Sequence, residues 1–129
     1  MRKIDNFKNS LAVLKQADYE QANCDDIYRM GIIGQFNLTF ELAWKALQAV
    51  LRLYSVSGAE TGSPRDILKM AYTNGFLSDS EEWLLMLKKR NTNVHIYDEE
   101  EIDELLLLIR DSFTPAFERL ADMLQEKEK

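Results

Sequence analysis

The segment from Asp26 to Tyr54 constrains the fold most, because it reads as one uninterrupted helix of about 40 Å. Its apolar side chains cover more than one side: Ile27, Met30, Ile33, Phe36, Phe40, Ala43, Trp44, Leu47, Val50 and Leu51. A helix with so wide an apolar surface is central to a bundle or lies in a subunit interface. Gly31 and Gly34 cost such a helix about 1 kcal/mol each relative to alanine. They indicate either the close approach of another backbone or glycines tolerated without a role.

The chain before this segment predicts one amphipathic helix, from residue 3 to about residue 20. Its apolar residues recur every three or four positions: Ile4, Phe7, Leu11, Leu14 and Ala17. Asp25 or Asp26 can cap the long second helix, since the helix dipole favours negative charge there. A loop follows over residues 55–62.

A third helix is marked at both of its ends. Ser63 precedes Pro64 and stands three residues before Asp66, the pattern of a capping box with proline at the first helical position. Asn74 and Gly75 form a typical stop signal. The spacing therefore predicts a short helix between them.

Two further helices complete the chain. Ser78 with Glu81 predicts a capping box that opens a fourth helix, which ends near residues 91–93 because Asn and Thr favour turns. Asp98 with Glu101 opens a fifth, and Pro115 should kink or split it by removing a hydrogen bond. Period-two alternation is absent from the sequence. We therefore expect a single all-α domain over residues 1–129, an up-and-down bundle of four or five helices with a long second helix and a proline-kinked last helix.

Composition narrows the class of protein. Hydrophobic residues make up 46% of the 129 residues and charged residues 29%, as in soluble globular domains. Cys24 is the only cysteine, so no internal disulfide can form. The polar N-terminus does not resemble a signal peptide, and the longest apolar run, Leu105 to Ile109, is too short to span a bilayer. We expect a cytoplasmic protein that makes no membrane contact.

The acidic net charge argues against a protein that binds long nucleic acid. The formal net charge is -6, whereas binding through many phosphates requires a basic surface. A local cationic site remains open, and Lys88, Lys89 and Arg90 are its candidates.

The only histidine, His95, has Arg90 five residues before it and Tyr97 two after it. Histidine suits proton transfer near neutral pH, and the planar arginine fork matches phosphate oxygens. Together they supply the groups that phosphodiester cleavage requires. Residues five apart do not face each other on a helix, so a bend at residues 91–93 would be needed to bring both into one cleft. From the residues alone, an ordinary surface turn is the other interpretation, and phosphate-loop, nucleophile and metal motifs are absent.

The segment Arg90-Asn91 followed by His95 and Tyr97 resembles the R-x4-H-x-Y motif of the HEPN superfamily. The branch it resembles most is the nucleotidyltransferase substrate-binding proteins, the HEPN partners of minimal nucleotidyltransferases. The resemblance covers roughly residues 5–125. Other matching segments are 35–36, the Phe-Glu-Leu-Ala-Trp-Lys signature at 40–45, 63–65, 75–77 and 83–87. Lys89 departs from the pattern, in which an acidic residue precedes the Arg-Asn pair.

The resemblance implies a homodimer whose motif residues line a shared cleft, and one of two functions. In the first, the chain is the toxin of a toxin–antitoxin pair, an endoribonuclease that needs no metal or cofactor. Arg90 would position the scissile phosphate, Asn91 would orient the phosphate or His95, and His95 would transfer a proton. The partner would be a cognate minimal nucleotidyltransferase, an antitoxin that adds AMP to Tyr97.

In the second, the chain is a non-catalytic subunit that binds a nucleotide or another substrate for a separate nucleotidyltransferase. Arg90 and His95 would then be phosphate ligands. The acidic composition favours this alternative, whereas the complete motif favours the ribonuclease. Glu41 and Lys45 predict a surface ion pair by their spacing, although the signature makes both, with Lys89, candidates to line the cleft. Trp44 and Trp83 are interpreted as core or dimer-interface anchors.

Overall fold

The computed structural model describes residues 1–91 and 98–128, with the backbone alone at Asn91. All regular structure in these ranges is helical, which confirms the predicted all-α class. The elements are α1 (Arg2–Leu14), α2 (Tyr19–Ala22), α3 (Asp26–Leu53), α4 (Pro64–Thr73), α5 (Ser80–Asn91), α6 (Glu99–Leu108), the π-helical η2 (Ile109–Phe113) and α7 (Thr114–Glu128).

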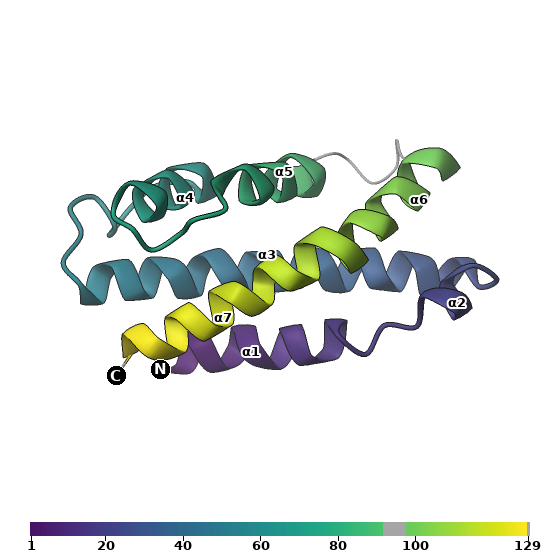
Figure 1. Ribbon diagram of the computed structural model, residues 1–129, viewed down its shortest axis with the longest axis horizontal. Helices are drawn as coiled ribbons and strands as arrows, with labels where there is room; N and C mark the ends of the chain where they lie inside the picture. The colour runs from purple at the N-terminus through teal and green to yellow at the C-terminus, as the bar shows by residue number, and fades with distance from the viewer. Residues whose placement is uncertain (92–97, 129) are drawn as a thin grey trace.

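The helices form an up-and-down bundle around α3 (Figure 1). Helices α1 and α7 lie along one side of α3, and α4 and α5 lie along the other. The two ends of the chain lie side by side at one end of the bundle, where the N-terminal ammonium group forms an ion pair with Glu128. The long helix is third in chain order because the short α2 precedes it.

Aromatic rings from four helices fill the centre of the bundle. The ring of Phe117 on α7 lies 6.0 Å from Phe7, 6.1 Å from Phe36 and 5.4 Å from Trp83, measured between centroids. Trp83 in turn lies 6.1 Å from Phe40. All five side chains are fully buried. Such pairs add about 0.5–1.5 kcal/mol each beyond the area they bury, so α1, α3, α5 and α7 depend on a common aromatic core.

The first helix is shorter than its apolar stripe predicted. It ends at Leu14, and Asp18 then caps α2 by accepting hydrogen bonds from the backbone N–H groups of Glu20 (3.0 Å) and Gln21 (3.1 Å). An Asp side chain that bonds to nearby backbone competes with helix continuation. The prediction of one helix to about residue 20 is therefore wrong, although Ala17 still packs against the core.

The ends of α4 match their prediction. The Ser63 hydroxyl accepts from the Asp66 N–H, and the Asp66 carboxylate accepts from the Ser63 N–H, both at 3.2 Å. At the other end, Gly75 adopts a φ of 78°, and the Phe76 N–H donates to the Ala71 carbonyl at 2.8 Å. This pattern is a Schellman motif, for which glycine carries no steric penalty. The predicted caps of α3 and α6, at Asp25 and Asp98, are also present.

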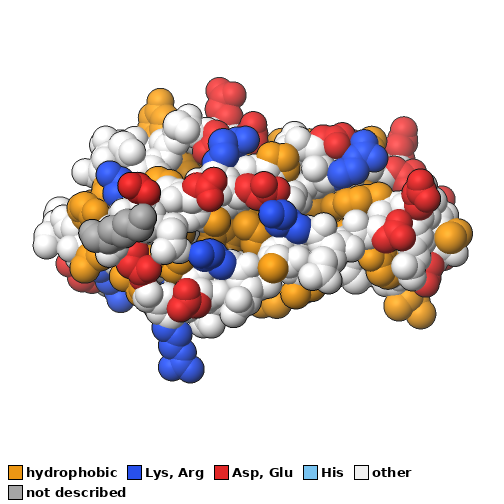
Figure 2. Space-filling model, turned by 60° about the horizontal axis from the view of Figure 1, so that its bottom comes forward, with side chains coloured by type: hydrophobic (Ala, Val, Ile, Leu, Met, Phe, Trp, Pro, Cys, Tyr) orange, Lys and Arg blue, Asp and Glu red, His pale blue; other side chains and the backbone are white. Residues whose placement is uncertain are grey.

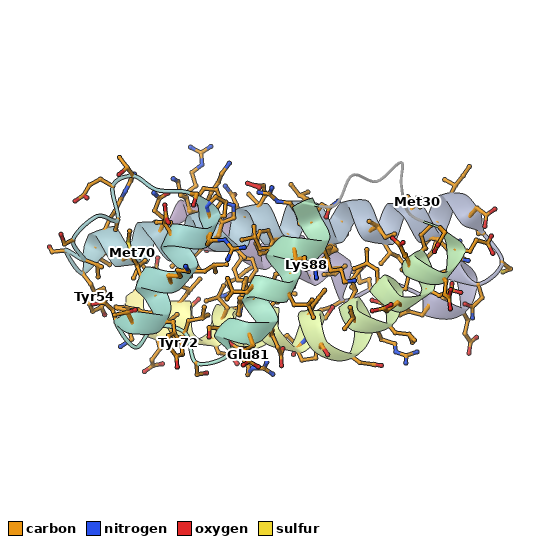
Figure 3. The ribbon with its side chains drawn as sticks, turned by 90° about the horizontal axis from the view of Figure 1, so that it is seen from above. Met30, Tyr54, Met70, Tyr72, Glu81 and Lys88 are labelled. Carbon is orange, nitrogen blue, oxygen red and sulfur yellow. The ribbon has the colours of Figure 1, made fainter. Side chains whose placement is uncertain are left out.

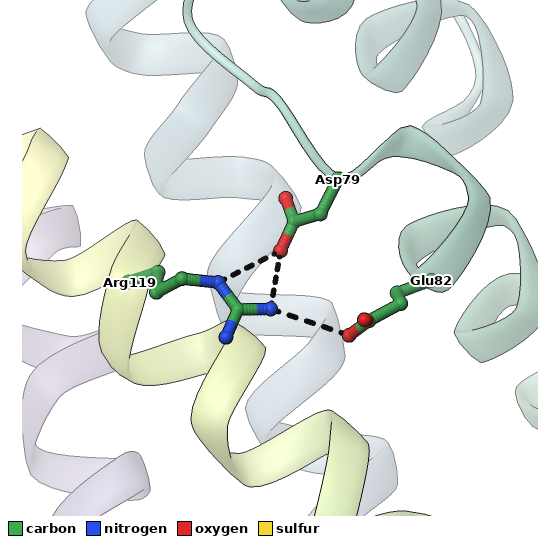
Figure 4. Close-up of polar contacts among 3 residues, drawn as sticks. All are labelled: Asp79, Glu82 and Arg119. Carbon is green, nitrogen blue, oxygen red and sulfur yellow. Dashed lines mark hydrogen bonds and ion pairs between the residues drawn. The ribbon is translucent and has the colours of Figure 1, made fainter.

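The predicted capping box at Ser78 and Glu81 is not formed. Helix α5 begins at Ser80, and its first backbone hydrogen bonds end on the carbonyl oxygen of Asp79. The Asp79 carboxylate accepts from Nε and Nη2 of Arg119 on α7, at 3.2 and 2.8 Å, and Glu82 contacts the same Nη2 at 3.3 Å (Figure 4). These carboxylates raise the pKa of the Arg119 guanidinium. The start of α5 is thus tied to α7.

Pro115 perturbs the last helix, as predicted, but does not break it. The proline ring removes a backbone donor and clashes with the carbonyl four residues earlier. The chain accommodates it by widening into the π-helical η2 immediately upstream and then returning to an α-helix at Thr114. The prediction of a kink or split becomes, in the structure, a local change of helix type.

The described surface carries mixed charge. On the face shown in Figure 2, acidic and basic side chains alternate, with apolar side chains between them. Within residues 1–91 and 98–128, no helix combines the length and the apolar composition needed to cross a membrane.

Candidate functional site around Arg90 and Glu41

The last turn of α5 meets the middle of α3. Seen from above, α5 runs from Glu81 toward Lys88 across the long helix (Figure 3). The contact of Trp83 with Phe40 fixes this crossing, because both side chains are fully buried. The crossing brings the Arg90 end of α5 to residues 40–45 of α3, the segment of the family signature.

Arg90 rests on two residues of α3. Its Nη2 donates to Oε1 of Glu41, forming an ion pair between side chains that are 27% and 34% exposed. Its guanidinium carbon lies 5.6 Å from the centroid of the Phe40 ring, within the range of a cation–π contact. Because a planar cation is held at both an edge and a face, its orientation is restricted as well as its position.

The Glu41 carboxylate is bound at both oxygens. Oε1 contacts Arg90, and Oε2 accepts a hydrogen bond from the indole Nε1–H of Trp44 at 2.9 Å. Lys45 points to the neighbouring ring instead, with its Nζ 5.9 Å from the Trp44 centroid. The Glu41–Lys45 ion pair that the spacing predicts is therefore replaced by contacts of Glu41 with Arg90 and Trp44.

The other two cations of the basic run differ from Arg90 in their surroundings. Lys89 is partly buried and lies 3.8 Å from the Glu104 carboxylate on α6. Lys88 is exposed. The sequence groups the three residues, but the structure directs Lys89 toward α6 and Arg90 toward α3.

His95, Tyr97 and the side chain of Asn91 lie outside the described residues. Of the predicted site, the structure therefore brings together Arg90 and Glu41, with Lys45 one contact away across Trp44. Among the described residues, no group of three or more His, Cys, Asp or Glu side chains is placed to hold a metal ion.

Two residues of this site were not predicted as site residues, namely Phe40 as a platform for Arg90 and Trp44 as a partner of Glu41. The sequence predicts Trp44 as a core or dimer-interface anchor. A signal was present, because Trp44 follows Phe40 by four positions and Glu41 by three, so its side chain is a neighbour of both on the helix surface. Which face α5 would cover could not be read from that spacing.

The chain belongs to the family described as nucleotidyltransferase substrate binding protein like, whose model matches residues 2–126. This match confirms the resemblance to the nucleotidyltransferase substrate-binding proteins. A comparison with curated protein sequences finds no match.

Solved structures share the fold over almost their whole length. HI0074 from Haemophilus influenzae, described as a substrate binding domain of a nucleotidyltransferase, has 22% identity and a TM-score of 0.80, with 95% of this chain and 98% of that chain covered. A tri-AMPylated HEPN toxin of Shewanella oneidensis, in complex with MNT antitoxin, has 20% identity and a TM-score of 0.79, with 97% and 95% covered. A Thermus thermophilus protein has 27% identity and a TM-score of 0.69, with 94% and 97% covered. At these identities the likeness establishes the fold.

Proposed function

We propose that this chain is a HEPN-type toxin, a metal-independent endoribonuclease silenced by a cognate minimal nucleotidyltransferase antitoxin. The observation that carries the proposal is the contact of motif residue Arg90 with Glu41 and Phe40 of the signature helix. Two segments 49 residues apart, each part of the family resemblance, meet at one cation. The likeness to a HEPN toxin bound to its MNT antitoxin supports the same proposal.

In this proposal Arg90 binds the scissile phosphate and stabilises the charge that grows on its oxygens during attack. His95 accepts the proton of the ribose 2′-hydroxyl as its oxygen attacks phosphorus. The bond from phosphorus to the 5′-oxygen of the next nucleotide breaks, which leaves a 2′,3′-cyclic phosphate, and the departing 5′-oxygen takes a proton from water. Asn91 orients the phosphate or His95. The site would be completed by a second copy of the chain in a homodimer.

Silencing would act two residues from His95. The antitoxin would transfer AMP to the Tyr97 hydroxyl, which places a phosphate charge and a nucleoside beside the proton-transfer group. Both the charge and the volume oppose entry of an RNA phosphate.

The test is expression of this chain alone beside its His95→Ala variant, with growth and RNA integrity followed in both cultures. Growth arrest and RNA cleavage in the wild type alone are expected. Healthy growth and intact RNA in both cultures would contradict the ribonuclease, provided that mass spectrometry finds soluble wild-type protein free of AMP.

A second candidate is a non-catalytic subunit that presents a nucleotide or other substrate to a nucleotidyltransferase. The family description and that of HI0074 favour it. The same purified protein separates the two: saturable binding of a nucleotide without RNA cleavage would favour the subunit, and Arg90→Lys should weaken that binding.

A further inference from the structure

We propose that Trp44 and Glu41 are positioning residues that orient the Arg90 guanidinium for phosphate. The inference rests on the proposed function, in which Arg90 is the phosphate ligand. It assigns to Trp44 a role in the site through its indole N–H.

An isolated ion pair would not orient Arg90. Pairs between partly exposed long side chains stabilise little, because two flexible chains must be held in one geometry. Here the Glu41 side chain is 34% exposed and one carboxylate oxygen is bound by Trp44, so the carboxylate is held by a contact separate from Arg90. The Phe40 face then restricts the plane of the guanidinium.

The Trp44–Glu41 contact belongs to α3 alone. The two residues are three apart, so their side chains lie on the same helix face. Folding of α3 therefore sets the carboxylate independently of the segment that carries the rest of the motif. The packing of α5 on α3 through Trp83 brings Arg90 to the Glu41 carboxylate and the Phe40 ring.

Glu41 could instead compete with phosphate for Arg90, and that role predicts a change in activity of the opposite sign when Glu41 is substituted. Releasing Glu41 would then strengthen phosphate binding and raise activity. Under the positioning role, releasing Glu41 lets the guanidinium rotate, and activity falls.

The decisive variant is Trp44→Phe, which keeps an aromatic ring and removes the N–H. Glu41→Gln is the second variant, because it turns one of the two accepting oxygens into an NH₂ group, which cannot accept from Arg90 or from Trp44. Glu82→Gln is the matched control: it makes the same charge change and removes a carboxylate–arginine contact on the same helix α5, but away from Arg90. Circular dichroism verifies folding of each.

Two readouts are taken on each protein. The first is the ¹⁵N nuclear magnetic resonance signal of the Arg90 Nε–H, identified by its loss in Arg90→Lys and read without RNA. The second is the rate of RNA cleavage, separated into kcat and KM. We expect Trp44→Phe and Glu41→Gln to shift and broaden the Arg90 signal and to lower kcat by about 10- to 100-fold, as misplaced catalytic groups do, with little change in KM. Glu82→Gln should change neither.

An Arg90 signal unchanged in folded Trp44→Phe would overturn the positioning role, as would a rise in kcat. If the wild type cleaves no RNA, the proposed function fails, while the Arg90 signal still tests the contact network in the same samples.

Discussion

The guanidinium of Arg90 lies over the ring of Phe40, with 5.6 Å between the guanidinium carbon and the ring centroid. The contact depends on the flat, delocalised charge of arginine. Lysine is a point charge that can neither present a planar fork nor stack in the same way. The identity of residue 90, and not only its charge, is therefore tied to the structure.

Arg90→Lys should lower RNA cleavage by about 100-fold, the scale of a group displaced by roughly 1 Å. Its thermal stability should stay close to that of the wild type, because the pair with Glu41 is partly exposed and such pairs contribute little. The measurement is the initial rate on a labelled RNA, with Arg119→Lys as a control distant from the site. Wild-type activity in Arg90→Lys would show that the fork is not required.

Tyr97→Phe should fold and cleave RNA, yet resist silencing by the nucleotidyltransferase, because the hydroxyl that would accept AMP is gone. Intact-mass spectrometry after incubation with the partner and ATP measures the transfer, and RNA cleavage measures the silencing. AMP found elsewhere on this variant would remove Tyr97 from the proposal.

Ser55→Gly should raise the free energy of unfolding by about 0.5–1 kcal/mol. Ser55 follows the C-cap of α3 with a φ of 57°, a left-handed conformation that glycine adopts without strain. The backbone hydrogen bond from Val56 to Leu51, at 2.9 Å, should be retained. Urea unfolding measures the change, and a loss of stability would contradict it.

Tyr19→Phe should reduce the loss of stability at alkaline pH. Burial raises the pKa of the Tyr19 hydroxyl above its ordinary value of 10.0, with Asp111 adding to the shift and Arg110 opposing it. The native state therefore keeps this proton to higher pH than the unfolded chain does, so stability falls as pH rises above about 10. Melting temperatures from about pH 9 to pH 11 measure the slope, with Tyr72→Phe as an exposed control. Equal slopes for Tyr19→Phe and the wild type would refute the assignment.

Gly31→Ala and Gly34→Ala test what covers α3. A Cβ added at either position meets no atom of the described chain within 4 Å. In the isolated chain each substitution should stabilise the helix by about 1 kcal/mol. If the backbone of a second copy packs there in the proposed homodimer, the same substitutions should weaken association. Denaturation at several protein concentrations separates the stabilisation of the single chain from the weakening of its association. Destabilisation that does not depend on protein concentration would contradict both of these expected effects.

Local signals predicted most of this fold. The capping box of Ser63 and Asp66 and the stop at Gly75 formed as expected, because each is complete within a few residues. Errors arose where two local signals competed: α1 ended at Leu14 and Asp18 capped the separate helix α2 although the apolar stripe continued, and Asp79 rather than Ser78 preceded α5.

The contacts of the site were harder to predict from the sequence, because they join segments that are distant along the chain. The i, i+4 spacing of Glu41 and Lys45 predicted a local ion pair, but Glu41 binds Arg90, 49 residues away in sequence. That choice depends on the crossing of α5 over α3, which the buried contact between Trp83 and Phe40 determines. Periodicity identifies each apolar face, and only the packed structure shows which face meets which.

The π-helical η2 also changes the phase of the last helix. A π turn holds one residue more than an α turn, so everything beyond it is rotated by about a quarter of a turn around the axis. On a regular α-helix of about 3.6 residues per turn, Leu105 and Phe117 would point roughly 120° apart, and the extra residue brings their directions closer together. The continuous helix can in this way use α6 to pack against α3, and α7 to pack against both α1 and α3. Deleting one residue from η2 would turn the apolar side of α7 away from Phe7 and Phe36.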